Sequence, residues 1–475
     1  MLRYPAGRRT IPAVDAPESF GPTLDEAATL AARWLDGVRD GRIPPTATTD
    51  EVKDALGREL PDRGAGAPEV LRRMAAAIEP GLMRMGSPRF HGWVIGGAEP
   101  ASLGADWLVG AWDQNAAMRA VTPGVAAAEE LAEEWVLGVL GLPATASAGF
   151  VTGATAANVV GLTCARDEVL RRAGWDAAAD GLAGGPRIRL LAGAERHGSV
   201  DTAARLAGLG QAELVDADDQ GRLRVDALRR ALHGTDAPTI VCLQAGNVHS
   251  GAFDPIADAV ELAHRAGAWV HVDGAFGLWA AAAPGLKHLT AGLEGADSWA
   301  TDAHKTLNVP YDCGIAMVAQ PQWMRASFAT HAAYLPSSTD IADQSDRVPE
   351  LSRRARGVPV FAALAQLGRE GVADLVQRLA DSAQVIADGL RTVPGASILN
   401  DVVYTQVCAS FGSDERTRAV GDALLAGGRA LASASTWRDR AVLRFSVSNW
   451  LTDRAEAQRT VDAVRAAVAS VGETD

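Results

Sequence analysis

Two short segments carry residues whose types could act together in catalysis. The first is His271-Val272-Asp273-Gly274-Ala275, and the second, Asp302-Ala303-His304-Lys305-Thr306, places a lysine 32 positions after that aspartate. A lysine amine can form a Schiff base with the aldehyde of pyridoxal phosphate (PLP), and a carboxylate can pair with the ring nitrogen of this cofactor. Taken singly, each residue has a commoner structural explanation: a surface lysine at a strand end, and an aspartate in a salt bridge or helix cap.

Two further segments extend the pattern. Residues 150–158 are typical of a strand end, a glycine turn and a helix start, where backbone amides and the hydroxyl of Thr152 or Thr155 suit a phosphate ester. Simple helix capping is the alternative. His197 follows a predicted strand and suits stacking on a flat ring and proton transfer, although a lone histidine is more often structural. Four such signals in a fixed order predict a PLP site.

Alternating elements must position these residues. From residue 148 onward, short apolar runs alternate with longer helical patterns, and the runs show β-branched residues without polar interleaving. This pattern predicts a mostly parallel sheet with helices on both faces, whose ligands bind outside the carboxyl ends of the strands. Asp273 and Lys305 both fall at such ends. The predicted strands are 188–192, 239–243, 269–272, 298–300 and 315–318.

Three domains are predicted: an N-terminal helical segment over 1–90, a large α/β domain over 91–355 and a small C-terminal α+β domain over 356–475. In the first, Thr23-Leu24-Asp25-Glu26 predicts a helix start through a capping box, and the apolar stripe of that helix could pack on its own chain or on a second subunit. The remaining patterns predict helix, turn and helix over 100–142, helices over 358–367 and 371–390, and strands over 402–408 and 441–447.

Composition excludes several classes of function. The chain has 475 residues, 48% of them hydrophobic and 22% charged, with a net charge of −13 and no basic run, which disfavours nucleic acid and membrane partners. No stretch of about 18 apolar residues predicts a membrane span. The four cysteines are too far apart for a zinc site or disulfide framework, so no metal and a cytoplasmic location are expected.

In their order and with their neighbours, these segments resemble the group II pyridoxal-dependent decarboxylases, a fold-type I PLP family that contains glutamate and aromatic amino acid decarboxylases. The resemblance runs from about His91 to Leu451 and is most specific in residues 272–277 and 302–314. It implies a mostly parallel seven-stranded sheet and a PLP cofactor.

The family also implies roles for individual residues. Lys305 would be the Schiff-base lysine, Asp273 the partner of the ring nitrogen and His197 the stacking histidine. Ala275 would pack on the opposite ring face. Ala154, Thr155 and His304 would bind the phosphate, and Asn247, where many members have threonine, would contact cofactor or substrate.

The substrate site follows from the same resemblance. Arg444 corresponds to an arginine that holds the substrate carboxylate, through the fork geometry that suits bidentate binding. His91, Trp93, Trp112 and Asn115 match segments that line the substrate pocket, in part from a second subunit. The resemblance therefore implies an amino acid substrate and a homodimer with active sites at its interface, and the aromatic residues slightly favour an aromatic or other apolar side chain.

One feature departs from the family. Many members protonate the carbanion left by loss of CO₂ with a tyrosine on a loop that here spans residues 337–350, and this loop contains no tyrosine. Tyr334 precedes it. Decarboxylation to an amine stays the first expectation, and the alternatives are an aldehyde-forming oxidase, an aldolase-like lyase or an aminotransferase. A non-catalytic protein of the same fold is a further alternative, which the intact pair of Asp273 and Lys305 disfavours.

Overall fold

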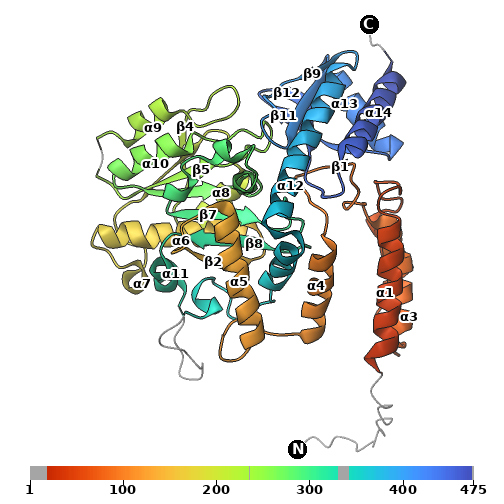
Figure 1. Ribbon diagram of the computed structural model, residues 1–475, viewed down its shortest axis with the longest axis horizontal. Helices are drawn as coiled ribbons and strands as arrows, with labels where there is room; N and C mark the ends of the chain where they lie inside the picture. Colours follow the sequence, from red (N-terminus) through yellow and green to blue (C-terminus); the bar gives the residue numbers. More distant parts are fainter. Residues whose placement is uncertain (1–18, 235, 330–341, 473–475) are drawn as a thin grey trace, which may run out of the picture. The chain divides into compact units, whose positions relative to one another are not determined.

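The computed structural model describes residues 19–234, 236–329 and 342–472 (Figure 1). The chain divides into two compact units, residues 1–84 and 85–475. The boundaries predicted at residues 90 and 355 stay predictions.

The first unit is helical over its described part. It contains α1 (Phe20–Asp36), α2 (Thr49–Leu56) and α3 (Ala67–Ile78). The prediction that the first helix starts at Thr23 was wrong, because α1 already begins at Phe20. Pro22 lies within its first turn, where a missing backbone N–H removes no helical hydrogen bond. A capping box does occur in this unit, but between Thr48 and Glu51 at the start of α2.

The second unit is built on a seven-stranded sheet, in agreement with the predicted fold-type I architecture. The strand order is β2-β8-β7-β6-β5-β3-β4, and all neighbours are parallel except that β8 runs antiparallel to β2 and β7. The strands are β2 (Ser147–Val151), β3 (Arg189–Gly193), β4 (Glu213–Val215), β5 (Thr239–Gln244), β6 (Trp269–Asp273), β7 (Ser298–Asp302) and β8 (Gly314–Val318).

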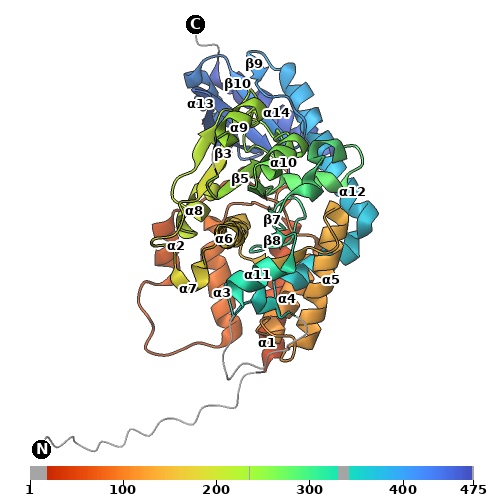
Figure 2. The same ribbon diagram turned by 90° about the vertical axis from the view of Figure 1, so that its left-hand side faces the viewer.

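Helices cover both faces of this sheet, and alternate strand residues enter two different cores (Figures 1 and 2). On β6, Val270 and Val272 pack in one core and Trp269 packs in the other. The Trp269 face is covered by α6 (Ala154–Arg172), α8 (Gly198–Leu206) and α11 (Pro321–Phe328). The opposite face is covered by α5 (Pro123–Leu140), α9 (Val225–Leu232) and α10 (Ile256–Arg265). The two-residue period of a strand therefore sorts its side chains between the two helical layers.

A second, five-stranded sheet closes the chain, with strand order β1-β11-β12-β10-β9. The long helix α12 (Gly357–Arg391) packs in the cores of both sheets and is broken at Gly368, where φ is 63°. This break separates the two helices predicted from the sequence. The remaining elements are α4 (Pro100–Trp112), α7 (Ala177–Asp180), α13 (Asp414–Gly427), α14 (Arg454–Val471), β1 (Phe90–His91), β9 (Ala396–Ile398), β10 (Gln406–Phe411), β11 (Leu431–Trp437) and β12 (Arg440–Ser446).

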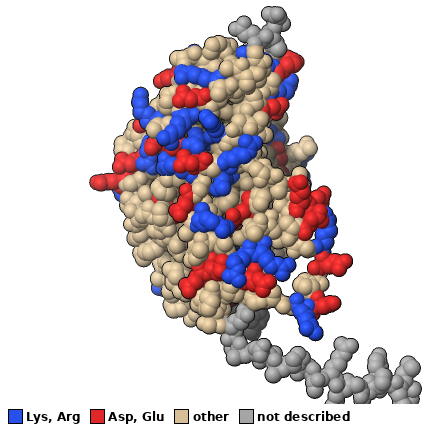
Figure 3. Space-filling model, turned by 90° about the vertical axis from the view of Figure 1, so that its right-hand side faces the viewer, with Lys and Arg blue, Asp and Glu red and all other residues tan. Residues whose placement is uncertain are grey.

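Three further features of the described residues concern membrane spans, metal-binding side chains and surface charge. No helix in the described ranges has the length and apolar character needed to cross a bilayer. Within the same ranges, no three metal-binding side chains come together, and all four cysteines are buried thiols. On the face drawn in Figure 3, acidic and basic side chains are interspersed rather than gathered by sign.

Candidate active site at the ends of strands β6 and β7

The sheet brings the two candidate residues to one edge. Strands β6 and β7 are parallel neighbours, with Asp273 in register with Ala300. Asp273 ends β6, and Lys305 follows the end of β7 by three residues. The two turns are joined because the backbone N–H of Asp302 donates to the carbonyl of Ala275 at 2.8 Å. Parallel strands therefore place Asp273 and the Lys305 segment at a common carboxyl edge, as predicted.

Asp273 is a buried carboxylate, 4% exposed, with which no lysine or arginine of the described residues forms a direct ion pair. It accepts hydrogen bonds from the backbone of Ala275 at 3.3 Å and from the hydroxyl of Ser199 at 3.4 Å. Burial raises the pKa of Asp273, whereas the nearby His197 and Lys305 act in the opposite direction. A buried carboxylate of this kind requires a positive partner, and the protonated ring nitrogen of PLP fits that requirement.

Lys305 has a partner that the sequence-based interpretation missed. Its Nζ lies 2.8 Å from Oδ2 of Asp302, and its side chain is 19% exposed. Asp302 is buried and ends β7, so the ion pair holds the amine at the edge of the sheet.

An anion site lies at the start of α6. The backbone N–H of Ala154 donates to Oδ1 of Asp302 at 2.6 Å, which shows that this helix start accepts a negative group. Nε2 of His304 lies 3.4 Å from the same oxygen, while its Nδ1 accepts from the backbone of Cys313. Gly153 leaves space here, since a Cβ would lie 3.4 Å from both Asp302 and His304. The exposed Thr155 is in the same first turn. These residues fit a phosphate ester.

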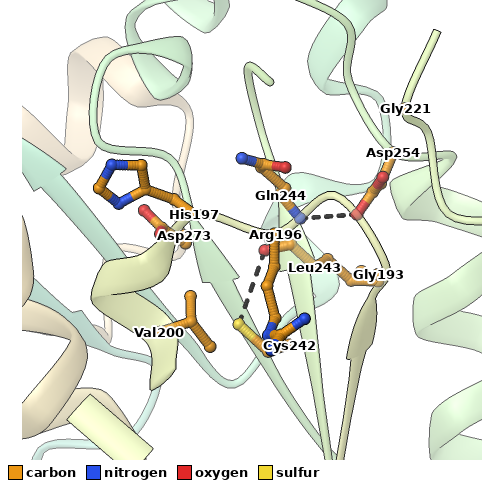
Figure 4. Close-up of a pocket in the computed structure, with 10 residues that line it drawn as sticks. All are labelled: Gly193, Arg196, His197, Val200, Gly221, Cys242, Leu243, Gln244, Asp254 and Asp273. Carbon is orange, nitrogen blue, oxygen red and sulfur yellow. Dashed lines mark hydrogen bonds between the residues drawn. The ribbon is translucent and has the colours of Figure 1, made fainter. Parts of the chain in front are cut away.

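His197 lies beside Asp273 (Figure 4). It is the N-cap of α8, and its Nδ1 accepts from the backbone N–H of Ser199 at 3.2 Å. Nδ1 is therefore the acceptor of this ring, and Nε2 is left as its donor. Because the imidazole is exposed and adjacent to Asp273, it can cover a flat ring held by that carboxylate.

Ala275 and Asn247, two further predicted cofactor residues, differ in their exposure and in the groups they contact. Ala275 is partly exposed, and its backbone joins the ends of β6 and β7. Asn247 is 1% exposed, and its Oδ1 accepts from the backbones of His249 and Ser250. Its amide nitrogen lies 3.4 Å from the carbonyl of Glu195. The Asn247 side chain therefore organises the loop after β5, and its contact with cofactor or substrate stays a prediction.

Arg444 is a buried cation on β12 of the smaller sheet, 6% exposed. Its Nε has no hydrogen-bond partner, and no carboxylate of the described residues pairs with it. Burial lowers the pKa of its guanidinium. An unpaired buried guanidinium of this kind favours an anionic ligand such as a carboxylate.

The other predicted substrate residues are not part of this cluster in the single chain. His91 is buried, and its Nε2 lies 3.0 Å from the hydroxyl of Thr460 on α14. Trp93 and Trp112 are 56% and 50% exposed, and Trp112 lines a cavity of about 610 Å³ beside α4 and α5. Asn115 is exposed, and its Oδ1 accepts from the backbone of Arg353. Tyr334 and residues 337–341 of the tyrosine-free loop lie outside the described residues.

Four residues near Asp273 and Lys305 were missed from the sequence: Asn158, Ser199, His271 and Asp302. The sequence carried a signal for His271, because it precedes Asp273 by two positions and therefore shares its face of β6. Asp302 stands three positions before the lysine in the quoted segment. Asn158 and Ser199 reach Asp273 from other elements, α6 and α8, so their role depends on tertiary packing.

Comparison with known proteins identifies the family of the chain. The model of the pyridoxal-dependent decarboxylase conserved domain matches residues 50–411. Tryptophan decarboxylase 1 of Oryza sativa subsp. japonica is 26% identical over 466 residues, covering 90% of each chain. The 4-hydroxyphenylacetaldehyde synthase of Rhodiola rosea is 25% identical over 352 residues, covering 71% of this chain and 69% of its own.

Solved structures confirm the fold. The crystal structure of Oryza sativa TDC with PLP and tryptamine superposes with a TM-score of 0.89 at 22% identity, over 97% of this chain and 99% of that one. The family match covers most of the chain, and the buried carboxylate, the lysine and the anion site fit the cofactor that gives the family its name. The chain therefore belongs to the pyridoxal-dependent decarboxylases, which are PLP-dependent lyases.

Proposed function

We propose that this protein decarboxylates an L-amino acid with an aromatic or other apolar side chain, using Lys305 as the Schiff-base lysine. One observation carries the proposal: an unpaired buried carboxylate, Asp273, and a partly buried lysine, Lys305, lie at the carboxyl ends of adjacent parallel strands. Bound PLP supplies an electron sink for the electron pair that remains when CO₂ leaves the α-carbon.

The residues of the chain provide position and charge. Asp273 would pair with the positive ring nitrogen, and the start of α6 with His304 would bind the phosphate. His197 would cover one face of the ring, and its Nε2, the nitrogen not occupied by Ser199, would donate to the substrate. Asp302 orients Nζ of Lys305. Arg444 binds the substrate carboxylate, which a buried unpaired guanidinium favours.

The preference for an apolar substrate rests on the exposed tryptophans and on the relatives. Trp93 and Trp112 present large apolar surfaces, and a second subunit can bring such residues to the site. The relatives that act on tryptophan or on aromatic L-amino acids, as their names state, agree with this preference.

A second function is favoured by one specific observation. The loop over 337–350 has no tyrosine, and a relative of this chain is named 4-hydroxyphenylacetaldehyde synthase. Without a rapid proton donor, dioxygen would take two electrons from the decarboxylated substrate and become hydrogen peroxide, and water would then release an aldehyde and ammonia, with CO₂ as the remaining product.

Product analysis separates the two functions. The holoenzyme is incubated with single L-amino acids, and CO₂, primary amine, aldehyde, ammonia and peroxide are measured with and without dioxygen. Decarboxylation predicts one primary amine per CO₂, independent of dioxygen. Aldehyde with ammonia and peroxide, formed only under dioxygen, would establish the second function, and absence of CO₂ with every amino acid would refute both.

A further inference from the structure

Strand β6 presents a second polar residue beneath Asp273. His271 is fully buried and lies on the same face of the strand as Asp273, toward α6. Its Nε2 lies 2.8 Å from Oδ1 of Asn158, and its Nδ1 lies 2.8 Å from the hydroxyl of Ser298. That hydroxyl also accepts from the indole N–H of Trp269 at 2.9 Å. A continuous hydrogen-bonded chain therefore runs inside the protein from Trp269 to Asn158.

Asn158 connects this chain to the candidate site. It is fully buried on α6, one turn after Ala154 at the anion site. Its side chain hydrogen-bonds to Asp273, and this bond lowers the pKa of the Asp273 carboxyl against the effect of burial. Its Nδ2 also lies 3.4 Å from the hydroxyl of Ser199, which donates to Asp273. The amide nitrogen of Asn158 therefore faces the carboxylate.

The direction of each hydrogen bond follows from the chemistry of the groups. Burial lowers the pKa of His271 to about 3, so at neutral pH its imidazole has one donor and one acceptor. The Asn158 oxygen can only accept, which places the proton on Nε2 of His271. Nδ1 then accepts from the hydroxyl of Ser298, which in turn accepts from Trp269. With the Asn158 amide reversed, its oxygen would face the Asp273 carboxylate, which would keep only the donors from Ala275 and Ser199.

We propose that His271 is a positioning residue: its Nε2–H fixes the orientation of the Asn158 amide, which keeps a hydrogen-bond donor on the Asp273 carboxylate that would pair with the cofactor ring nitrogen. This inference rests on the proposed role of Asp273. The hydrogen bonds from Trp269 to Ser298, from Ser298 to His271 and from His271 to Asn158 point in one direction. Because aligned hydrogen bonds polarise one another in a low-dielectric interior, these three strengthen the bond from Asn158 to the carboxylate.

Helix α6 leaves space for this imidazole. At Gly161, a Cβ would lie 2.6 Å from both Cε1 and Nδ1 of His271 and 3.4 Å from the hydroxyl of Ser298. A glycine in a helix interior is destabilising by roughly 0.5–1 kcal/mol relative to alanine. The glycine is therefore explained by close packing of α6 on the His271 ring, three residues after Asn158.

The test compares His271→Gln with His271→Leu, two side chains of similar size. Glutamine retains one donor for Asn158 and one acceptor for Ser298, and leucine retains neither. Each holoenzyme is reconstituted with PLP carrying ¹⁵N in the ring, and the ring nitrogen is observed by solid-state NMR. We expect the glutamine variant to keep the ¹⁵N shift of a protonated ring. The leucine variant is expected to move toward the unprotonated shift, with kcat lowered roughly tenfold to hundredfold by the unsatisfied amide.

Two further variants keep the test decisive if His271→Leu does not fold. Ser298→Ala retains the imidazole and removes only its donor, and it is expected to move the ¹⁵N shift in the same direction by less. In an Asn158→Leu background, His271→Leu is expected to cause no further change in shift or kcat, because His271 acts through Asn158. The control His264→Leu, on α10 against Asp297, is expected to leave the shift unchanged.

Protonated rings in both His271→Leu and Ser298→Ala, or equal loss in His271→Gln and His271→Leu, would overturn the inference. Failure of the proposed function is a different result. In that case the wild-type protein itself would release no CO₂ from any amino acid, whatever the ¹⁵N shifts of the variants.

Discussion

Arg444 illustrates how one residue can define a substrate. Its guanidinium is buried in β12 without a carboxylate partner among the described residues. Lysine at this position would retain the charge and lose the planar fork that binds a carboxylate through two parallel hydrogen bonds.

We therefore expect Arg444→Lys to raise KM for the amino acid roughly tenfold to hundredfold, the range of one charged hydrogen bond, with a smaller change in kcat. Steady-state CO₂ release measures both constants. Arg440 is an exposed residue of the same strand and serves as a control. The variant Arg440→Lys is expected to change neither KM nor kcat. An unchanged KM in Arg444→Lys would remove Arg444 from the substrate site.

Burial of His91 makes the stability of the protein depend on pH, and its role in the substrate pocket stays a prediction. Burial lowers the pKa of His91 to about 4, from an ordinary value of 6.5. Between these values the unfolded chain binds a proton that the folded protein does not, so this histidine makes the protein less stable as the pH falls from 6.5 toward 4. Its contribution is about 1.4 kcal/mol per pH unit.

From pH 6 to pH 5, the free energy of unfolding of the wild type is expected to fall by about 1.4 kcal/mol more than that of the His91→Gln variant. Urea unfolding at the two pH values measures this difference. His264→Gln is the control, since the hydrogen bond to Asp297 raises the pKa of His264 and both states are protonated over this range. An equal pH dependence in wild type and His91→Gln would show that His91 is protonated in the folded protein.

Among the elements, helix α6 has the most connections to the candidate site. Its start forms the anion site, Asn158 reaches Asp273, and Gly161 packs on His271. An alanine at Gly161 would place a methyl group 2.6 Å from the imidazole. We expect Gly161→Ala to lower the free energy of unfolding by roughly 1–3 kcal/mol, the usual effect of an overpacked core.

Gly138 on α5 is the matched control, because a Cβ there would meet only the flexible end of Arg369 at 3.5 Å. Gly138→Ala is expected to increase stability by roughly 0.5–1 kcal/mol through helix propensity. Thermal unfolding of both variants checks the pair. A stabilising Gly161→Ala would contradict the close packing of α6 on β6.

Strand positions were predictable because their signals are local. The five predicted strands correspond to β3, β5, β6, β7 and β8, and the helix break at Gly368 separates the two predicted halves of α12. The strand end predicted at residue 150 lies in β2, whereas β1, β4, β9 and β11 did not appear as distinct apolar runs. β11, whose burial alternates, has polar residues between its buried ones. The start of α1 was misplaced because a capping box is also compatible with the helix interior.

The site was predictable where the residue type itself carries the chemistry, as for Lys305, Asp273 and His197. It was not predictable where a contact joins distant segments. Asp302 pairs with Lys305 and caps α6, which lies 148 positions earlier at Ala154. The interpretation of β6 as a run without polar residues overlooked His271, whose imidazole is buried only because Gly161, Asn158 and Ser298 surround it.

For the whole molecule, the central expectation is a dimer whose sites need both chains. Trp93, Trp107, Leu108 and Trp112 are exposed in the single chain, and exposed aromatic surface of this kind is typical of an interface. If Trp112 acts in the site of the partner, a Lys305→Ala chain and a Trp112→Ala chain form a heterodimer with one intact site.

Each variant alone is expected to be strongly impaired, and mixing equal amounts with subunit exchange is expected to restore about a quarter of wild-type activity, since half of the dimers are mixed and each has one intact site. Sedimentation measures the dimer, and CO₂ release measures the recovery. A fully active monomer would refute the dimer, and no recovery on mixing would place Trp112 in the site of its own chain.

The most direct test of the account is chemical trapping of the cofactor. The chain has only three lysines, Lys53, Lys287 and Lys305, so reduction of the holoenzyme with borohydride and peptide mass spectrometry gives an unambiguous assignment. The account predicts a phosphopyridoxyl group on Lys305 alone, lost in Lys305→Ala and retained in Lys287→Ala. A group on Lys53 or Lys287, or on no lysine, would contradict it.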